Sequence, residues 1–177
     1  MNKYASAGAV LVALQALLVG GYLLLEDRRD AVSVSETEAP ETITSPLPEL
    51  AVRYVDGSTR NLTELRGRPL LLHFWATWCP PCREELPGLL ALADRRDAQV
   101  LLVALDEHWE PVRRFLGGPI PAYVALADGD QVKRRFGVHE LPESFVVDGA
   151  GNMTLRFRGA RDWTSRATLA LLPMEMR

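Results

Sequence analysis

The sequence predicts an α/β domain in which helices cover a sheet. Apolar runs alternate with amphipathic ones from about Leu47 to Arg177, as in chains whose strands alternate with covering helices. Within this region, residues 70–76 (LLLHFWA) are almost continuously apolar, which indicates a strand buried on both faces. This part of the chain is long enough to bury a hydrophobic core of its own.

The composition agrees with one such domain and an additional segment. The chain has 177 residues, 20 Lys and Arg against 23 Asp and Glu, a net charge of −3, 47% hydrophobic residues and two cysteines. This balance excludes a disordered tail, a collagen and a disulfide-dense toxin, and it gives no reason to expect nucleic-acid binding. The function must therefore come from particular residues.

The additional segment begins the chain. Residues 5–25 carry no charge, and a helix of this length would be about 30 Å long, the thickness of the hydrocarbon core of a bilayer. A cleaved signal has a shorter apolar stretch and ends in small residues, whereas this one ends in Leu25 and Glu26. Residues 1–25 are therefore predicted to be an uncleaved transmembrane anchor. Residues 26–46, rich in Glu, Ser, Thr and Pro, are predicted to be a flexible linker.

The elements of the domain, residues 47–177, follow from turn and helix signals. An Asp-Gly turn at 56–57 between two short runs predicts a hairpin over residues 50–62. Apolar spacing predicts a helix over 79–96, and Gly117 ends a short helix over 111–116. The remaining predicted elements are strands at 100–105, 123–127, 144–147 and 153–158, and helices at 130–136 and 162–172.

The two cysteines lie where redox chemistry is favoured. Cys79 and Cys82 enclose only Pro80 and Pro81, a separation that chance would give in roughly one case in a hundred. They follow the buried strand and open a helix, where free N–H groups and the positive end of the helix dipole favour a thiolate. A bridge across so small a loop would stabilise the fold little, so reversible formation is the better explanation.

The two thiols are predicted to have different roles. Cys79, at the exposed tip before the helix, is the candidate nucleophile that attacks a partner's disulfide, and Cys82, one turn inside, is the candidate resolving thiol. Pro81 is tolerated in a first turn, and together with Pro80 it stiffens the loop. Half of a zinc site is the alternative, but a structural zinc needs four ligands, and the chain offers only three histidines besides the two sulfurs. No metal is therefore expected.

Around the cysteines the chain resembles a known family. The stretch from Phe74 to Cys82 (FWATWCPPC) resembles the active site of the thioredoxin superfamily. With an anchor in front, the chain is most similar to the TlpA/ResA/DsbE group of membrane-anchored thiol-disulfide oxidoreductases. A second matching element is residues 137–148 (GVHELPESFVVD). The resemblance implies a thioredoxin fold, a mixed sheet of about five strands flanked by helices, with an N-terminal β-hairpin extension and no cofactor.

The resemblance also implies a substrate-binding surface. In this family the proline of the second element follows a cis peptide bond and lies beside the dithiol, so Leu141–Pro142 is expected to be cis. Such a turn leaves backbone groups free to pair with an extended substrate segment. The residues expected to contact substrate are Trp78, Pro80, Pro81, Leu141, Pro142 and Glu143. The basic residues Arg156, Arg158 and Arg161 are interpreted as a solvated face.

A buried acid is expected to move the proton of the inner thiol. Glu85 matches the acidic residue of the anchored group and lies one helical turn after Cys82, on the same side. The resemblance thus implies that Glu85, directly or through water, acts as base for Cys82. The alternative is a solvated glutamate like Glu84. His73 stands at the position of the thioredoxin acid, and either shares the proton work or is a hydrogen-bonded core residue.

The predicted function is that of a thiol-disulfide oxidoreductase. Dithiol chemistry works best outside the cytosol, so the domain is expected on the periplasmic side of a bacterial cytoplasmic membrane, with residues 5–25 in the lipid bilayer. The resemblance implies reduction of protein disulfides, such as those of apocytochrome c, with electrons supplied by a membrane thiol transporter. The direction of transfer depends on the relative stability of the reduced and oxidised forms.

Three alternatives use the same residues differently. A copper carrier would bind its ion through Cys79, Cys82 and His139, since sulfur and imidazole suit copper. A thiol oxidase or peroxidase shares the fold, but Thr77 is one residue too close to Cys79 for the Thr-x-x-Cys pattern of peroxidases. A binding adaptor would retain the dithiol without using it.

Overall fold

The computed structural model describes Gln15, residues 39–95 and 99–173, and Met176. The chain divides into two compact units, Met1–Glu36 and Thr37–Arg177. Apart from Gln15, the predicted anchor and residues 26–38 of the predicted linker lie outside the described residues. Among the described residues, no helix has the length and apolar character needed to cross a membrane.

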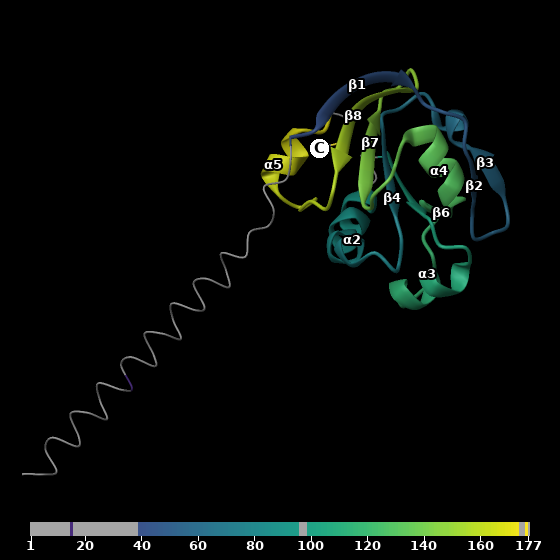
Figure 1. The fold of residues 1–177 in the computed structure, drawn as a ribbon, viewed down its shortest axis with the longest axis vertical. Coiled ribbons are helices and arrows are strands. Elements are labelled where there is room, and N and C mark those ends of the chain that lie inside the picture. The colour runs from purple at the N-terminus through teal and green to yellow at the C-terminus, as the bar shows by residue number, and fades with distance from the viewer. Residues whose placement is uncertain (1–14, 16–38, 96–98, 174–175, 177) are drawn as a thin grey trace, which may run out of the picture. The chain divides into compact units, whose positions relative to one another are not determined.

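The second unit is built on one mixed sheet of eight strands in the order β1-β8-β7-β4-β5-β6-β2-β3 (Figure 1). The bounds are β1 Glu41–Pro46, β2 Ala51–Arg53, β3 Thr59–Asn61, β4 Leu70–Trp75, β5 Gln99–Ala104, β6 Val124–Leu126, β7 Glu143–Val147 and β8 Asn152–Arg158. The parallel pairs are β4 with β5 and β5 with β6, whereas β7 runs antiparallel to both of its neighbours, β4 and β8. The α/β class and the mixed sheet are confirmed.

The expectation of about five strands was too low. The five central strands, from β8 to β6, correspond to the five predicted for the core. The predicted hairpin forms as β2 and β3, but it also joins the same sheet, through the pairing of Arg53 with Leu126. At the opposite edge, β1 pairs antiparallel with β8.

Strand β1 corrects the predicted linker. The prediction of a flexible segment that includes residues 41–46 rests on their content of Glu, Ser, Thr and Pro. Their side chains are indeed mostly exposed, and Ile43 is the residue of this strand that packs against the core. An edge strand gains its stability from backbone pairing with its one neighbour, so its sequence need not be hydrophobic. The folded domain therefore includes Glu41–Pro46 and begins earlier than the predicted residue 47.

The strand at the centre explains the long apolar run. Every residue of β4 is buried, and successive side chains point to opposite faces. Leu71 and Trp75 belong to the core shared with Leu86 of the helix that follows. Leu72 and Phe74 belong to a second core on the other face. The strand is therefore covered on both sides, as predicted.

The helices are η1 Leu62–Leu65, α2 Pro80–Ala93, α3 Trp109–Leu116, α4 Gly129–Phe136 and α5 Arg166–Ala170. Gly117 ends α3 in the left-handed conformation that glycine permits. The final helix is shorter than the predicted 162–172. Asp162 accepts hydrogen bonds from Thr164, and Ser165 caps the helix instead.

Candidate active site

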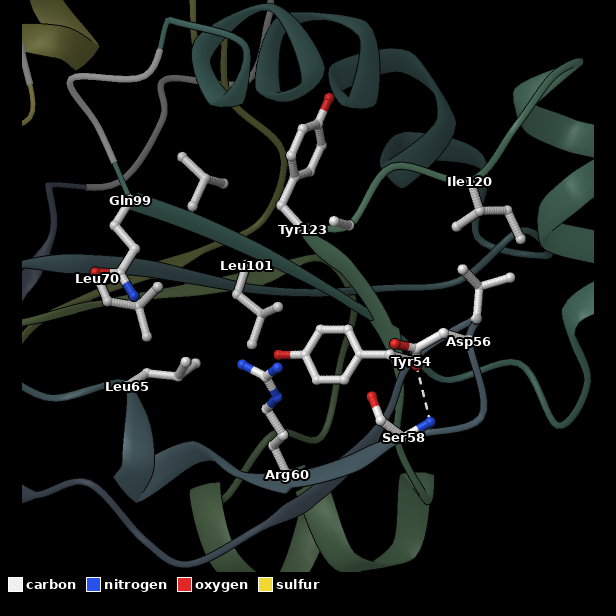
Figure 2. Close-up of a pocket in the computed structure, with 13 residues that line it drawn as sticks. Tyr54, Asp56, Ser58, Arg60, Leu65, Leu70, Gln99, Leu101, Ile120 and Tyr123 are labelled. Carbon is white, nitrogen blue, oxygen red and sulfur yellow. Dashed lines mark hydrogen bonds between the residues drawn. The ribbon is translucent and has the colours of Figure 1, made fainter.

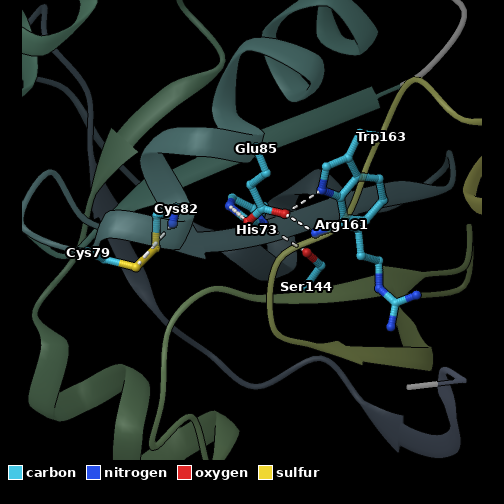
Figure 3. A network of polar contacts seen from close by, with 7 residues as sticks. All are labelled: His73, Cys79, Cys82, Glu85, Ser144, Arg161 and Trp163. Atoms are coloured by element: carbon cyan, nitrogen blue, oxygen red, sulfur yellow. Dashed lines mark hydrogen bonds and ion pairs between the residues drawn. A yellow bond between two sulfur atoms is a disulfide. The ribbon is translucent and has the colours of Figure 1, made fainter. Parts of the chain in front are cut away.

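The two cysteines lie at the junction of β4 and α2 and are joined by a disulfide (Figure 3). Cys79 is the N-cap of α2, and Pro80 and Pro81 occupy its first two positions, where no intrahelical N–H is lost. The backbone N–H of Cys82 donates to Cys79 Sγ at 3.3 Å. An opened bridge would thus leave a Cys79 thiolate facing an N–H donor at the positive end of a helix dipole.

The two sulfurs differ in exposure. Cys79 is 5% exposed and Cys82 is fully buried, so the order of accessibility is the predicted one. Cys79 is nevertheless much less exposed than an exposed tip would be, because its side chain packs within the core beside α2. The neighbouring Trp78 is 67% exposed, and Pro80 and Pro81 are exposed as well. Exposed apolar side chains therefore flank Cys79, the less deeply buried of the two cysteines.

The loop before Cys79 is fixed by Asp106, a residue that no sequence motif singles out. Asp106 is buried and lies just after β5. Its carboxylate accepts hydrogen bonds from the backbone N–H of Thr77 at 3.0 Å and from the Thr77 hydroxyl at 2.6 Å. Because β4 and β5 are parallel neighbours, their following loops meet at the same edge of the sheet. The contact holds the approach to the dithiol in place.

Glu85 is buried, so the alternative of a solvated surface glutamate was wrong. One carboxylate oxygen, Oε2, accepts hydrogen bonds from the backbone N–H of Arg161 at 2.9 Å and from Trp163 Nε1 at 2.8 Å (Figure 3). Burial raises the pKa of Glu85 to about 7, although these two hydrogen bonds and the Arg161 charge act in the opposite direction. A carboxyl with such a pKa can exchange its proton near neutral pH.

His73 lies on β4 and faces the same side of the sheet as α2. Its ring is fully buried, with Nδ1 2.8 Å from Ser144 Oγ and Nε2 3.4 Å from Glu85 Oε1. Burial lowers the pKa of His73 to about 3, so the imidazole is neutral at physiological pH. The structure therefore places His73 both in the core and against Glu85.

The Leu141–Pro142 peptide bond is cis, as expected. The loop containing it leads into β7, whose first residue, Glu143, pairs with Phe74 near the end of β4. The loop therefore lies at the same edge of the sheet as the dithiol. Beside it is a cavity of about 610 Å³, lined by Gly137, His139, Glu140, Leu141, Pro142, Glu143, Arg156, Arg158 and Gly159.

Two of the three basic residues predicted to form a solvated face, Arg156 and Arg161, are instead largely enclosed by the fold. Arg156 forms an ion pair with the buried Glu143 and donates to the carbonyl of Gly137 at 2.9 Å. Burial raises the pKa of Glu143, and the Arg156 charge opposes that shift. Arg161 is buried, with its guanidinium 4.6 Å from the centre of the Phe157 ring. Of the three arginines, Arg158 alone is more than half exposed, in a surface pair with Glu41.

Figure 2 shows a second cavity, of about 400 Å³. Its lining includes Leu70 and Gln99, the first residues of β4 and β5, whereas Cys79 follows the last residue of β4. The two cavities are therefore at opposite ends of the sheet. Two residues that line this second cavity, Arg60 and Tyr54, contact each other, with the guanidinium 5.7 Å from the centre of the ring.

Among the residues that the structure describes, no group of three His, Cys, Asp or Glu side chains is placed to hold a metal. Cys79, Cys82 and His139, the set required by the copper alternative, do not form such a group. His139 instead lines the cavity beside the cis-proline loop.

A dithiol at the mouth of a helix, next to a cis-proline loop on a mixed sheet, defines a thioredoxin-like thiol-disulfide oxidoreductase. The chain belongs to the Redoxin family, whose model matches residues 39–172, and within it to the ResA/DsbE group. Thiol-disulfide oxidoreductase ResA of Geobacillus thermodenitrificans is 31% identical, over 81% of this chain and 80% of the relative. A DsbE homologue of Paracoccus denitrificans is 30% identical, over 94% of this chain and 93% of the relative.

The fold comparison agrees. The crystal structure of a thiol:disulfide interchange protein of the thioredoxin family from Chlorobium tepidum matches with a TM-score of 0.55 and 27% identity. The match covers 70% of this chain and 91% of that one. The resemblance predicted from the two sequence elements is confirmed, and so is the oxidoreductase function.

Proposed function

We propose that this oxidoreductase reduces protein disulfides outside the cytoplasm, with the disulfides of apocytochrome c as substrates. The observation that carries the proposal is the disulfide between a slightly accessible Cys79 and a fully buried Cys82. The names of the ResA and DsbE relatives support thiol-disulfide exchange as the reaction. Residues 5–25 anchor the chain in the cytoplasmic membrane, with the domain in the periplasm. A membrane thiol transporter supplies the electrons.

The reaction proceeds in two exchanges. The Cys79 thiolate attacks a substrate disulfide, which breaks and releases one substrate thiolate, and a mixed disulfide forms through Cys79. The Cys82 thiolate then attacks Cys79 Sγ and releases the second substrate thiolate. The substrate gains two electrons, and the enzyme is left with the Cys79–Cys82 disulfide. The donor returns the enzyme to its dithiol form.

The substrate segment binds along the apolar surface around Cys79. Trp78, Pro80 and Pro81 form the exposed side of this surface, and Leu141 offers the backbone of the cis-proline loop for strand-like pairing. Pro142 shapes this loop, since its own carbonyl already accepts from the Gly159 N–H at 3.0 Å. Glu143 contributes from within the fold, because its ion pair with Arg156 ties the loop to β8.

Direction is tested by equilibration with a substrate. The reduced full-length chain, mixed with an oxidised apocytochrome c peptide, is expected to reduce the peptide and to end mainly as the Cys79–Cys82 disulfide. Acid quenching, alkylation and mass spectrometry measure the four species, and a double Cys79→Ser, Cys82→Ser variant gives the background. An equilibrium in which the enzyme stays reduced and the peptide stays oxidised contradicts the proposal.

The proton of Cys82 passes to Glu85. Glu85 follows Cys82 by three residues in α2, so the two side chains are neighbours on one helix face, and both are buried. In this environment the pKa of Glu85 is raised to about 7, which suits a group that must take and return a proton.

This proton role predicts a pH effect on Cys82. In a reduced Cys79→Ser chain, the pH profile of Cys82 alkylation is expected to show an inflection near pH 7, because the nearby carboxyl changes charge there. Glu85→Gln is expected to remove that inflection, and Glu84→Gln, on the exposed neighbour, to leave it in place. Alkylation rates measured from pH 5 to 10 make the comparison. Identical profiles in all three chains would end the proposed role.

A further inference from the structure

Two buried polar atoms face each other between β4 and α2. His73 Nε2 lies 3.4 Å from Glu85 Oε1, and neither atom has another hydrogen-bond partner among the described residues. The remaining polar atoms of both side chains are occupied. Glu85 Oε2 accepts from Arg161 and Trp163, and His73 Nδ1 contacts Ser144 Oγ. Buried polar groups are costly without a partner, so one proton must lie between Nε2 and Oε1.

The groups around this pair come from three segments. Cys82 lies on α2 with Glu85, and Ser144 contributes its hydroxyl from β7. Between β8 and α5, Arg161 brings a backbone donor and a positive charge near Glu85, and the Trp163 ring packs edge-on to His73 at 6.4 Å between ring centres. The Ser144 hydroxyl can either donate a hydrogen bond to His73 Nδ1 or accept one from it.

Both protonation states of Glu85 can be satisfied in this arrangement. With Glu85 ionised, His73 carries its proton on Nε2 and donates to Oε1, while the Ser144 hydroxyl donates to Nδ1. With Glu85 protonated, its O–H donates to Nε2, and His73 carries its proton on Nδ1 and donates to Ser144 Oγ. The second state holds one more proton, taken up from solvent, and the number of hydrogen bonds is the same in both. A neutral imidazole next to a hydroxyl permits this exchange because each offers a donor and an acceptor.

We propose that His73 is a positioning residue which exchanges imidazole tautomers as Glu85 gains or loses its proton, with the Ser144 hydroxyl turning to match. The inference deepens the proposed proton role of Glu85. It also gives His73 a part that packing alone would not, since an apolar core residue would satisfy neither state of Glu85 Oε1.

Nitrogen NMR of the full-length oxidised chain in detergent micelles tests this directly. With ¹⁵N-labelled histidine and ¹³C-labelled glutamate, Nδ1 and Nε2 of His73 are expected to exchange their protonated and unprotonated signals between pH 5 and 9. The pH at the midpoint of this exchange is expected to equal the pH at which the ¹³C signal of the Glu85 carboxyl is half titrated. His108→Gln and His139→Gln variants assign the three imidazoles. Because the measurement needs no turnover, its outcome is separate from whether Glu85 proves to be the base for Cys82.

Variants sharpen the result. Glu85→Gln is expected to fix His73 in one tautomer at every pH, and Glu84→Gln is expected to change nothing. In His73→Phe, the ionised carboxylate loses its donor, so the Glu85 midpoint is expected to rise by about one pH unit or more. The inference is overturned if His73 keeps one tautomer while Glu85 titrates, if it becomes doubly protonated in this range, or if Glu85 does not titrate at all.

Discussion

Replacing Cys82 by serine is expected to trap the enzyme on its substrate. The Cys79 thiolate still attacks the substrate disulfide, but no thiol remains at the buried position to attack Cys79 Sγ. The mixed disulfide therefore accumulates, and turnover falls to the rate of uncatalysed exchange between free thiols. Non-reducing electrophoresis with an oxidised apocytochrome c peptide measures the adduct, and tryptic mass spectrometry locates it at Cys79.

The matched variant is Cys79→Ser, which keeps the fully buried Cys82 as its one thiol. It is expected to form no adduct, because the exposed fraction of Cys82 is zero and a partner's disulfide cannot reach it. Adduct formation through Cys82 in this variant, without any through Cys79 in the other, would reverse the assigned roles.

Glu85 is expected to make the folded protein less stable as the pH rises. Its pKa is raised from 4.5 to about 7 in the folded chain. Below pH 4.5 both folded and unfolded chains hold the proton. Between pH 4.5 and 7 the unfolded chain releases it first, so the contribution of Glu85 to the free energy of unfolding falls with increasing pH, by about 3 kcal/mol in all, and levels off above pH 7.

Urea denaturation of the oxidised protein at pH 4.5 and pH 8 measures this contribution. Glu85→Gln is expected to lose less stability between the two pH values than the unchanged chain, by about 3 kcal/mol, since glutamine stays neutral and can accept the same two hydrogen bonds. The exposed Glu84→Gln serves as control for general charge effects. Equal pH dependence in the Glu85 and Glu84 variants would mean that Glu85 ionises in the folded chain as easily as in water.

The parts of the site that sequence predicts are those encoded locally. Cys79 and Cys82 lie three residues apart, and the apolar run before them marks a strand because burial on both faces excludes polar side chains. Their position at a strand-to-helix junction could therefore be derived without knowledge of the fold. The thioredoxin resemblance then added the cis Leu141–Pro142 bond, which composition does not indicate.

The partners that set the chemistry could not be predicted in this way. Glu85 accepts hydrogen bonds from Arg161 and Trp163, which lie 76 and 78 positions later in the chain. His73 contacts Ser144, which lies 71 positions later. Asp106 reaches Thr77 across 29 positions because two parallel strands end side by side. In the sequence, Ser144 and Asp106 do not differ from ordinary surface or core residues, and only the sheet brings them to His73 and Thr77.

Strand β1 also has a consequence for a shortened form of the protein. β8 is seven residues long, and without β1 one whole side of its backbone would present free amide and carbonyl groups. Such a row is a template for pairing with another chain and hence for aggregation. A shortened form should accordingly retain β1, Glu41–Pro46, even though Ile43 is the residue of this strand that packs against the hydrophobic core.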